Sequence, residues 1–516
     1  VIDHNRCILC GRCVRICAEV VANRTLDFGK RGWRTMLIAD LSQSLGESTC
    51  ISCGACTQAC PTGAIFSKIS AYRGRTTEGK IIHSVCSLCG VGCDIDVLVK
   101  DNNIVKITAT NLTGLKGQLC RKGRFEQIYR EAPRITTPIV TDVRGGSARR
   151  ASWEEALNRA SEGIRAYRSR YGTGSIAGLI SSLCPNETLE AFTKLMRQTV
   201  RTSLLDTLDG DLYRTLTQGI SLFSKNGQGL EIESPLESIL ETDFVLVVGG
   251  NPLESHPVAG CYVLRAQAQN QAGLVLIDSG QNDLGIHADR WLRPNEGDLK
   301  VVISALLQLV RNRKGVKMTP KAASSARAAP FGGLDETLLA QLGDMLARAR
   351  EPVIIYGDGV LNKKDPRLVA SLLELAKLAN PNGVKVVSLK PRGNSRGAWE
   401  LGVANRNGMA EAKPKLVYLL LADDDGSIES DVLQIVERAE FLIVQASYAS
   451  PLTEAADVVF PSPNWAEREG TYVSLDGKTG QSQRAVKPPQ GIKDDLEIIS
   501  QIAQRLRKRR LRLWPK

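Results

Sequence analysis

The sequence predicts an α/β protein built on parallel sheets, preceded by two smaller cysteine-rich units. From about residue 150 onward, short apolar runs such as Phe244–Val248 and Pro352–Tyr356 alternate with helix-like segments such as Trp153–Arg170. This alternation is typical of parallel strands that helices cover on both faces. Ahead of it, twelve of the fourteen cysteines fall within the first 120 residues. The cysteine-rich part and the α/β part therefore need separate interpretations.

The first two cysteine runs share one spacing. They read Cys7-x2-Cys10-x2-Cys13-x3-Cys17 and Cys50-x2-Cys53-x2-Cys56-x3-Cys60, and Pro61 follows the second. Thiolates at this spacing hold two [4Fe-4S] clusters, and the fourth cysteine of each run ligates the other cluster. We therefore predict a first cluster on Cys7, Cys10, Cys13 and Cys60 and a second on Cys50, Cys53, Cys56 and Cys17. Zinc sites and disulfides are the competing interpretations, but neither requires a doubled quartet.

A third cysteine run follows a polar linker. It reads Cys86-x2-Cys89-x3-Cys93 and is completed by Cys120, so we predict a third [4Fe-4S] cluster. Lys122 and Arg124 place positive charge beside this anionic centre, and Lys122 is expected to stabilise its reduced state. The segment Asp94–Thr110 alternates apolar and polar residues and predicts a hairpin. We expect a two-cluster ferredoxin-like domain over residues 1–70 and a small β-rich [4Fe-4S] domain over residues 78–135.

The distribution of charge along the chain indicates which classes of partner are expected. The net charge is +12, but the basic residues are scattered, so we expect no nucleic-acid partner. The dense run Arg505–Arg512 closes a helix-like segment, where cations suit the helix dipole, and we interpret it as a solvated helix end rather than a docking patch. No apolar stretch is long enough to span a membrane. Reduced cluster cysteines and the missing export signal favour a cytoplasmic location.

Several later phrases, together with the third cysteine run, resemble one family. These phrases are Cys120-Arg121-Lys122-Gly123-Arg124, Gly249-Gly250-Asn251-Pro252, Ile277-Asp278 and Glu454–Pro461. The chain resembles the large subunit of the molybdopterin oxidoreductase superfamily, above all NAD-linked formate dehydrogenases and the large iron–sulfur subunit of complex I. The resemblance implies two interleaved α/β subdomains over residues 136–516. It also implies that Gly249 and Asn251 form a turn for the pterin dinucleotide, and that Asp278 ends the strand that receives a nucleotide moiety.

The sequence departs from that family at the expected metal ligand. Catalytic members place a cysteine or selenocysteine there, followed by histidine, whereas Asp206–Thr215 contains neither residue type. Only Asp209 or Asp211 remains as a candidate ligand, and the two unassigned cysteines, Cys184 and Cys261, are expected to be buried. Asp278-Ser279-Gly280 lacks the arginine that would meet a phosphate, and the C-terminal cap domain is expected to be absent. A molybdopterin guanine dinucleotide is therefore not expected to bind.

Two functional hypotheses follow. The first is an iron–sulfur subunit that relays electrons through three clusters between a flavin-bearing NAD(P)H-oxidising subunit and other iron–sulfur subunits, as in complex I-like, bifurcating hydrogenase-like or transhydrogenase-like assemblies. In this hypothesis the part after residue 150 can serve as a docking platform. The alternative is a molybdenum or tungsten formate dehydrogenase subunit with unusual metal ligation. The first is preferred, because the matching segment offers no soft metal ligand.

Overall fold

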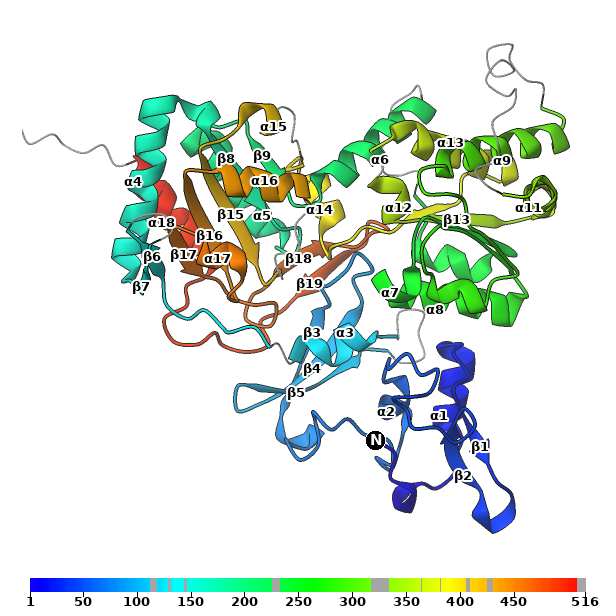
Figure 1. Ribbon diagram of the computed structural model, residues 1–516. Coiled ribbons are helices and arrows are strands. Elements are labelled where there is room, and N and C mark those ends of the chain that lie inside the picture. Colours follow the sequence, from blue (N-terminus) through cyan, green and yellow to red (C-terminus); the bar gives the residue numbers. More distant parts are fainter. Residues whose placement is uncertain are drawn as a thin grey trace, which may run out of the picture.

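The computed structural model describes residues 1–111, 118–128, 131–142, 146–224, 233–316, 334–362, 364–380, 382–404, 409–424 and 430–507. Residues 508–512 of the basic C-terminal run lie outside this part. Figure 1 shows the N-terminal module at one end, a small β-rich unit next to it, and two α/β lobes beyond. Within the described residues, no helix is both long and apolar enough to cross a membrane.

The N-terminal module pairs one hairpin with two short helices. Strands β1 (Leu26–Gly29) and β2 (Met36–Ala39) are antiparallel, and Leu26 lies opposite Ala39. Each helix, α1 (Arg12–Arg15) or α2 (Ala55–Ala59), follows a glycine in the left-handed conformation. Gly54, before α2, has φ of +71°, and a side chain there would collide with the Arg124 side chain. This glycine allows the N-terminal module to pack closely against the β-rich unit.

The β-rich unit is a three-stranded antiparallel sheet. Its strands are β3 (Lys80–Val85), β4 (Asp94–Lys100) and β5 (Asn103–Ala109). The predicted hairpin is confirmed as β4 and β5, and β3 adds a strand that the sequence analysis did not predict. Ile95 and Val97 are fully buried, as the alternating pattern requires. Helix α3 (Arg121–Arg124) begins directly after Cys120.

One α/β lobe contains a five-stranded parallel sheet in the order β12-β11-β10-β13-β14. Its strands are β10 (Phe244–Val248), β11 (Gly273–Ile277), β12 (Arg290–Leu292), β13 (Pro352–Tyr356) and β14 (Val386–Ser388). Its helices are α6 (Gly210–Phe223), α7 (Pro252–Ser255), α8 (Pro257–Asn270), α9 (Leu299–Arg313), α11 (Glu336–Arg348), α12 (Asp358–Leu361) and α13 (Pro366–Ala379). Every residue of β10 and β13 is buried, which explains their continuous apolar runs.

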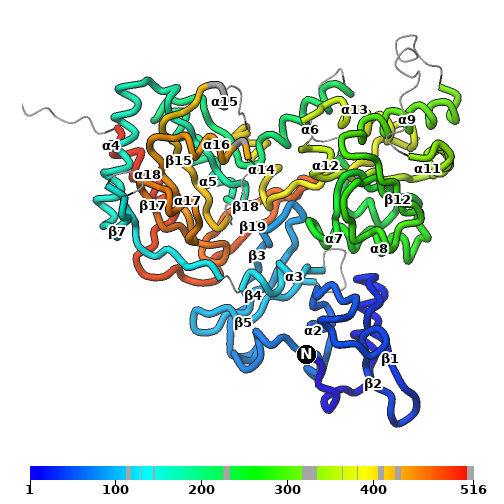
Figure 2. The backbone as a smooth tube through the Cα atoms, in the orientation of Figure 1, coloured from blue at the N-terminus to red at the C-terminus, as the bar shows by residue number. Residues whose placement is uncertain are grey.

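The other lobe contains a seven-stranded sheet in the order β7-β6-β17-β16-β15-β8-β9. Its strands are β6 (Ile139–Thr141), β7 (Ala148–Arg150), β8 (Ile176–Ile180), β9 (Leu205–Thr207), β15 (Leu416–Ala422), β16 (Phe441–Ala446) and β17 (Val458–Pro461). Its helices are α4 (Trp153–Tyr171), α5 (Asn186–Lys194), α14 (Ser395–Glu400), α15 (Met409–Ala412), α16 (Ser430–Arg438), α17 (Pro451–Glu454) and α18 (Asp495–Arg507). Strand β8 pairs with β15 from much later in the chain, so teal and orange segments run side by side in Figure 2.

A late hairpin joins the lobes to the β-rich unit. It is made of β18 (Gly470–Val473) and β19 (Thr479–Ser482), and the Ser482 hydroxyl lies 3.1 Å from that of Ser84 on β3. Gly480 packs on the Val85 side chain. The predicted fold class is confirmed: cysteine-rich and β-rich units precede α/β lobes with mainly parallel sheets.

Candidate functional site

The second predicted quartet lines a cavity of about 450 Å³ in the N-terminal module. Its cysteines are Cys17, Cys50, Cys53 and Cys56. Cys17 comes from the first run, and none of Cys7, Cys10, Cys13 or Cys60 lines this cavity. The fold therefore groups these thiols across the two runs, in the combination that the ferredoxin spacing predicts.

All four cysteines of this quartet are partly buried, and two of them have strongly raised pKa values. The pKa of Cys53 is raised to about 11 and that of Cys56 to about 12, in both cases mainly by burial, and the neighbouring thiols Cys53, Cys50 and Cys17 contribute to the rise at Cys56. Ser52 donates a backbone hydrogen bond to Cys50 Sγ at 3.4 Å. Thiols with raised pKa values are neutral in the empty site and release their protons when iron binds, so iron compensates the charge of the thiolates as it forms.

The first predicted quartet lies nearer the surface. Cys10 is exposed, whereas Cys7, Cys13 and Cys60 are partly buried. Burial raises the pKa of Cys13, and Cys10 and Cys7 raise it further. Burial also acts to raise the pKa of Cys60, but backbone hydrogen bonds from Ile65 and Thr62 outweigh it and lower that pKa. Cys60 packs against the same apolar cluster as Cys13, together with Cys17 and Cys56 of the second quartet.

The third predicted quartet lines a smaller cavity of about 230 Å³. All four of its cysteines, Cys86, Cys89, Cys93 and Cys120, contribute to the wall. Burial raises the pKa of each, to about 12 for Cys89. The cavity faces the loops after β10 and β13, because His256 and Asp358 also line it. In both cavities, a group of four cysteines fits the ligand set of a [4Fe-4S] cluster.

Hydrogen bonds to sulfur surround the third quartet. The Gly123 backbone N–H donates to Cys120 Sγ at 3.3 Å, and the Gln127 amide donates to Cys86 Sγ at 3.2 Å. A methyl group on Gly123 would lie 3.4 Å from Cys86 Sγ, so glycine allows this close approach. The sequence analysis missed Gln127. Its only signal was its position one helical turn after Gly123.

Replacing Gln127 by methionine should lower the midpoint potential of the third cluster. Donors to sulfur stabilise the reduced, more negative cluster more than the oxidised one. We expect a change of about 1 kcal/mol, roughly fivefold in the reduction equilibrium, since a hydrogen bond to a charged group is worth about 1.5–3 kcal/mol in total. A redox titration followed by electron paramagnetic resonance (EPR) measures this change, and the second cluster serves as an internal control. An unchanged third potential would contradict the role of Gln127.

Arg124 lies between the second and third quartets. Its side chain is only 2% exposed. Nε donates to the Cys53 carbonyl oxygen at 2.8 Å, and Nη1 donates to Gln58 Oε1 at 3.0 Å. Nη2 is buried without a hydrogen-bond partner among the described residues, and no carboxylate there pairs with this guanidinium. Burial lowers its pKa, while the thiols of Cys53, Cys56 and Cys120 act to raise it.

The expectation that Arg124 faces the third cluster is therefore incomplete. Although Arg124 follows Cys120 in sequence, its side chain reaches across the module boundary to Cys53 of the second quartet. Cys261 on α8 lies in the same region: it interacts electrostatically with Cys53 and Cys17 of the second quartet and with Cys120 of the third. Cys261 is 4% exposed and Cys184 is fully buried, so both are buried as expected.

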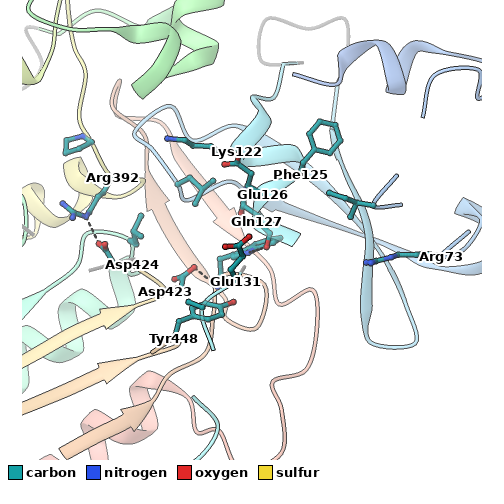
Figure 3. A pocket seen from close by; sticks show the side chains of 16 residues that line it. Arg73, Lys122, Phe125, Glu126, Gln127, Glu131, Arg392, Asp423, Asp424 and Tyr448 are labelled. Carbon is teal, nitrogen blue, oxygen red and sulfur yellow. Dashed lines mark hydrogen bonds and ion pairs between the residues drawn. The ribbon is translucent and has the colours of Figure 1, made fainter. Parts of the chain in front are cut away.

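A cavity of about 1040 Å³ lies at the carboxyl ends of β8 and β15. Figure 3 shows Lys122 and Gln127 on one side and Arg392, Asp423 and Asp424 on the other. Lys122 also lines the third-quartet cavity, where its charge acts to lower the pKa values of Cys89 and Cys120. The exposed Lys122 side chain therefore separates the third quartet from this cavity.

Two carboxylates at the end of β15 form ion pairs with arginines: Arg392, which lines this cavity, and Arg468, which does not. Asp424 accepts from Arg392 Nε at 2.7 Å and from the Ser181 hydroxyl at 2.6 Å. Asp423 lies 3.1 Å from Arg468 Nη1 and accepts from the Trp465 backbone N–H at 3.2 Å. Both arginines are thus neutralised by the chain's own acids.

The other predicted cofactor residues lie at the carboxyl edge of the five-stranded sheet. Gly249 follows β10, and its carbonyl accepts from Gly359 N–H at 2.8 Å. Asn251 donates to Glu254 and Asp283, and Asp278 accepts from Gly280 N–H at 3.0 Å and from Asn282. The structure brings Gly249, Asn251 and Asp278 to one edge. Lys122 is not among their contacts, and none of the three lines the large cavity.

The candidate metal ligands Asp209 and Asp211 are engaged elsewhere. Asp209 is 1% exposed and accepts hydrogen bonds from the Ser182 and Ser395 hydroxyls. Asp211 pairs with Arg214 and lies 3.2 Å from Lys364 Nζ. Neither lines the large cavity. Among the described residues, no group of three or more His, Cys, Asp or Glu side chains is arranged to hold a single metal ion.

Comparisons with known proteins cover nearly the whole chain. Family models match for molybdopterin oxidoreductase (residues 134–505), for the molybdopterin oxidoreductase Fe4S4 domain (80–127) and for a 4Fe-4S dicluster domain (6–64). The chain therefore contains Fe4S4 cluster-binding domains at both predicted places.

Similar curated proteins share about a quarter of its residues. NADPH-Fe(3+) oxidoreductase subunit alpha of Geobacter sulfurreducens is 26% identical, over 98% of this chain and 65% of its own length. An NADH-quinone oxidoreductase subunit of Rhizobium meliloti is 27% identical, over 98% and 62%. A putative formate dehydrogenase of Bacillus subtilis is 25% identical, over 98% and 61%. The chain thus spans less than two thirds of these relatives. Acetylene hydratase from Pelobacter acetylenicus shares the fold, with a TM-score of 0.63 at 14% identity over 82% of this chain and 69% of its own.

Proposed function

The chain belongs to the molybdopterin oxidoreductase family, and from this premise we propose that it is an iron–sulfur electron-transfer subunit of a multi-subunit NAD(P)H-linked oxidoreductase. It relays electrons through three [4Fe-4S] clusters, held by the three cysteine quartets. Its partners are a flavin-bearing NAD(P)H-oxidising subunit and further iron–sulfur subunits. Two relatives whose names specify subunits of NADH- and NADPH-dependent oxidoreductases support this proposal. Cluster thiolates must stay reduced, which agrees with a cytoplasmic location.

One observation carries the proposal: a single helical turn separates the second and third cysteine cavities. Along residues 120–126, the chain alternates between them. Cys120, Lys122 and Gly123 line the third-quartet cavity, whereas Arg121, Phe125 and Glu126 line the second-quartet cavity. Clusters held at these two places would be close neighbours, which electron transfer between them requires. The first quartet shares the N-terminal module with the second and continues the series toward the surface.

The clusters, when bound, supply one-electron redox chemistry, and the surrounding residues of the chain adjust their reduction potentials. Twelve thiolates hold the iron, and two of those at the third site, Cys86 and Cys93, are buried. N–H groups of Ser52, Gly123 and Gln127 stabilise charge on sulfur. Arg124 supplies positive charge between two sites and Lys122 supplies it beside the third. These are the means by which proteins adjust cluster potentials.

A second candidate is a molybdenum- or tungsten-pterin enzyme of the formate dehydrogenase type. The observation in its favour is the cavity of about 1040 Å³ that Lys122 separates from the third quartet. The residues present fit such a centre poorly. No cysteine or histidine lines this cavity, and the Asp423 and Asp424 carboxylates would repel an anionic dinucleotide while they occupy Arg468 and Arg392. We therefore keep the relay as the proposed function.

Elemental analysis of the purified chain separates the two candidates. The relay predicts about twelve irons per chain and neither molybdenum nor tungsten. Reduction by dithionite should then produce EPR signals from three [4Fe-4S] clusters, and formate should reduce none of them. Stoichiometric molybdenum or tungsten, with formate-dependent dye reduction, would establish the enzyme instead. An iron content for fewer than three clusters would refute the relay as described.

A further inference from the structure

The first cysteine quartet lies next to a distinct surface at the outer end of the N-terminal module. Ile8 and Leu9, which precede the exposed Cys10, are 64% and 43% exposed. The β1–β2 hairpin packs beside them, because a methyl group on Gly11 would lie 3.8 Å from the Phe28 ring. Figure 1 shows this hairpin pointing away from the α/β lobes. We call residues 7–15 and 28–34 together the first-cluster face.

This face is strongly basic. Its five cations are Arg12, Arg15, Lys30, Arg31 and Arg34, and all are exposed. Residues 7–15 and 28–34 contain no Asp or Glu. None of these cations forms an ion pair within the described part of the chain. Elsewhere on the surface, cations such as Lys100 and Arg149 do find carboxylate partners. Asp27, directly before residues 28–34, is an exposed acid beside this face, and the five cations outnumber it, so they leave a positive potential that attracts acidic surfaces.

The same face exposes large apolar side chains. Trp33 is 89% exposed and Phe28 is 36% exposed, close to the cationic residues of the hairpin. The Arg34 guanidinium lies 4.9 Å from the centre of the Trp33 ring. Exposed aromatic and arginine side chains are enriched at protein interfaces, where they provide most of the binding energy. Solvation alone does not account for a tryptophan this exposed beside a cluster site.

We propose that the first-cluster face docks a redox partner protein whose own redox centre is surrounded by acidic residues. The inference rests on the proposed function, since it requires a cluster on Cys7, Cys10, Cys13 and Cys60. The five cations select the partner by charge. Once the partner is bound, water is excluded from the interface by the apolar side chains of Ile8, Leu9, Phe28 and Trp33. One electron crosses the face: one centre is oxidised by one electron and the other is reduced by one, and no group moves. A complementary charge mainly accelerates the encounter.

Stopped-flow reduction by a photoreduced, acidic plant-type ferredoxin tests this surface. In the whole chain, Arg31→Glu with Arg34→Glu should lower the second-order rate constant at least about tenfold at low salt, and the unmodified rate should fall as salt rises. The matched control, Arg348→Glu with Arg350→Glu, makes the same charge change on the α/β part and should stay within about twofold. Dithionite should reduce all variants equally, because no predicted ligand is changed.

Other results would overturn the inference. Equal slowing in both variant pairs would assign the effect to overall charge. The rate of electron transfer from the reduced chain to a basic cytochrome c can be compared with the rate of transfer from the acidic ferredoxin to the chain. Equal rates would exclude selection of the partner by charge. If the unmodified chain self-associates and only Arg31→Glu with Arg34→Glu abolishes this, the face binds a second copy of the chain. If that variant alone abolishes binding to anionic lipid vesicles, the face binds a membrane. Missing clusters in the unmodified chain would refute the proposed function, whereas intact clusters without charge dependence would refute only this docking.

Discussion

Replacing Cys17 by alanine is expected to remove the second cluster and to leave the first in place. Cys17 belongs to the first run in sequence, yet it lines the second cavity with Cys50, Cys53 and Cys56. The Cys17→Ala and Cys50→Ala variants should therefore lose the same EPR signal and about four irons each. Cys13→Ala should lose a different signal. This is a large effect, because a cubane seldom persists on three protein thiolates.

Solvent access distinguishes the two clusters in this experiment. The first quartet includes the exposed Cys10, so a paramagnetic relaxation agent in solution should broaden the signal of its cluster more strongly. That broadened signal should persist in Cys17→Ala and vanish in Cys13→Ala. Cys261→Ala is the control, since Cys261 is buried beside the second and third quartets without being a predicted ligand, and it should keep all the iron. Loss of the broadened signal in Cys17→Ala would disprove crossed ligation.

Replacing Arg124 by glutamine should shift the potentials of two clusters together. The guanidinium is the buried cation between the second and third quartets, and it has no carboxylate partner in the described residues. Its positive charge favours the reduced, more negative state of each cluster. At an effective dielectric constant of about 20, the loss of one such charge amounts to about 2 kcal/mol, roughly 30-fold in the reduction equilibrium. An EPR-monitored redox titration should show both midpoint potentials falling, the second by more.

Two further variants separate charge from folding. Arg124→Lys keeps the charge but loses the forked donors, so it should recover much of the potential while the thermal unfolding temperature stays below that of the parent. Arg75→Gln removes a cation whose side chain is 86% exposed, and solvent should screen its effect. If Arg124→Gln moves only the third potential, the contact with Cys53 does not act on the second cluster.

Local patterns in the sequence were sufficient to predict the fold class and to propose the ligand sets. The crossed grouping of Cys17 with Cys50 joins two separate runs, and it was predicted because the doubled spacing as a whole is typical of two-cluster ferredoxins. Apolar runs such as those of β10 and β13 identify buried parallel strands for a similar reason, since burial on both faces leaves no polar position. The β4–β5 hairpin likewise follows from alternation over adjacent residues.

Features that depend on packing between distant segments could not be predicted from local sequence patterns. Arg124 faces Cys53, 71 residues earlier, because Gly54 lets the N-terminal module approach α3 closely. Asp424 neutralises Arg392 and Asp423 neutralises Arg468 because β15 lies beside β8 in the seven-stranded sheet, where its end meets loops from elsewhere in the chain. Spacing along the chain specifies contacts within a few residues, but the direction of a long side chain depends on which surface folds against it. The tertiary structure therefore decided which cluster each charge acts on.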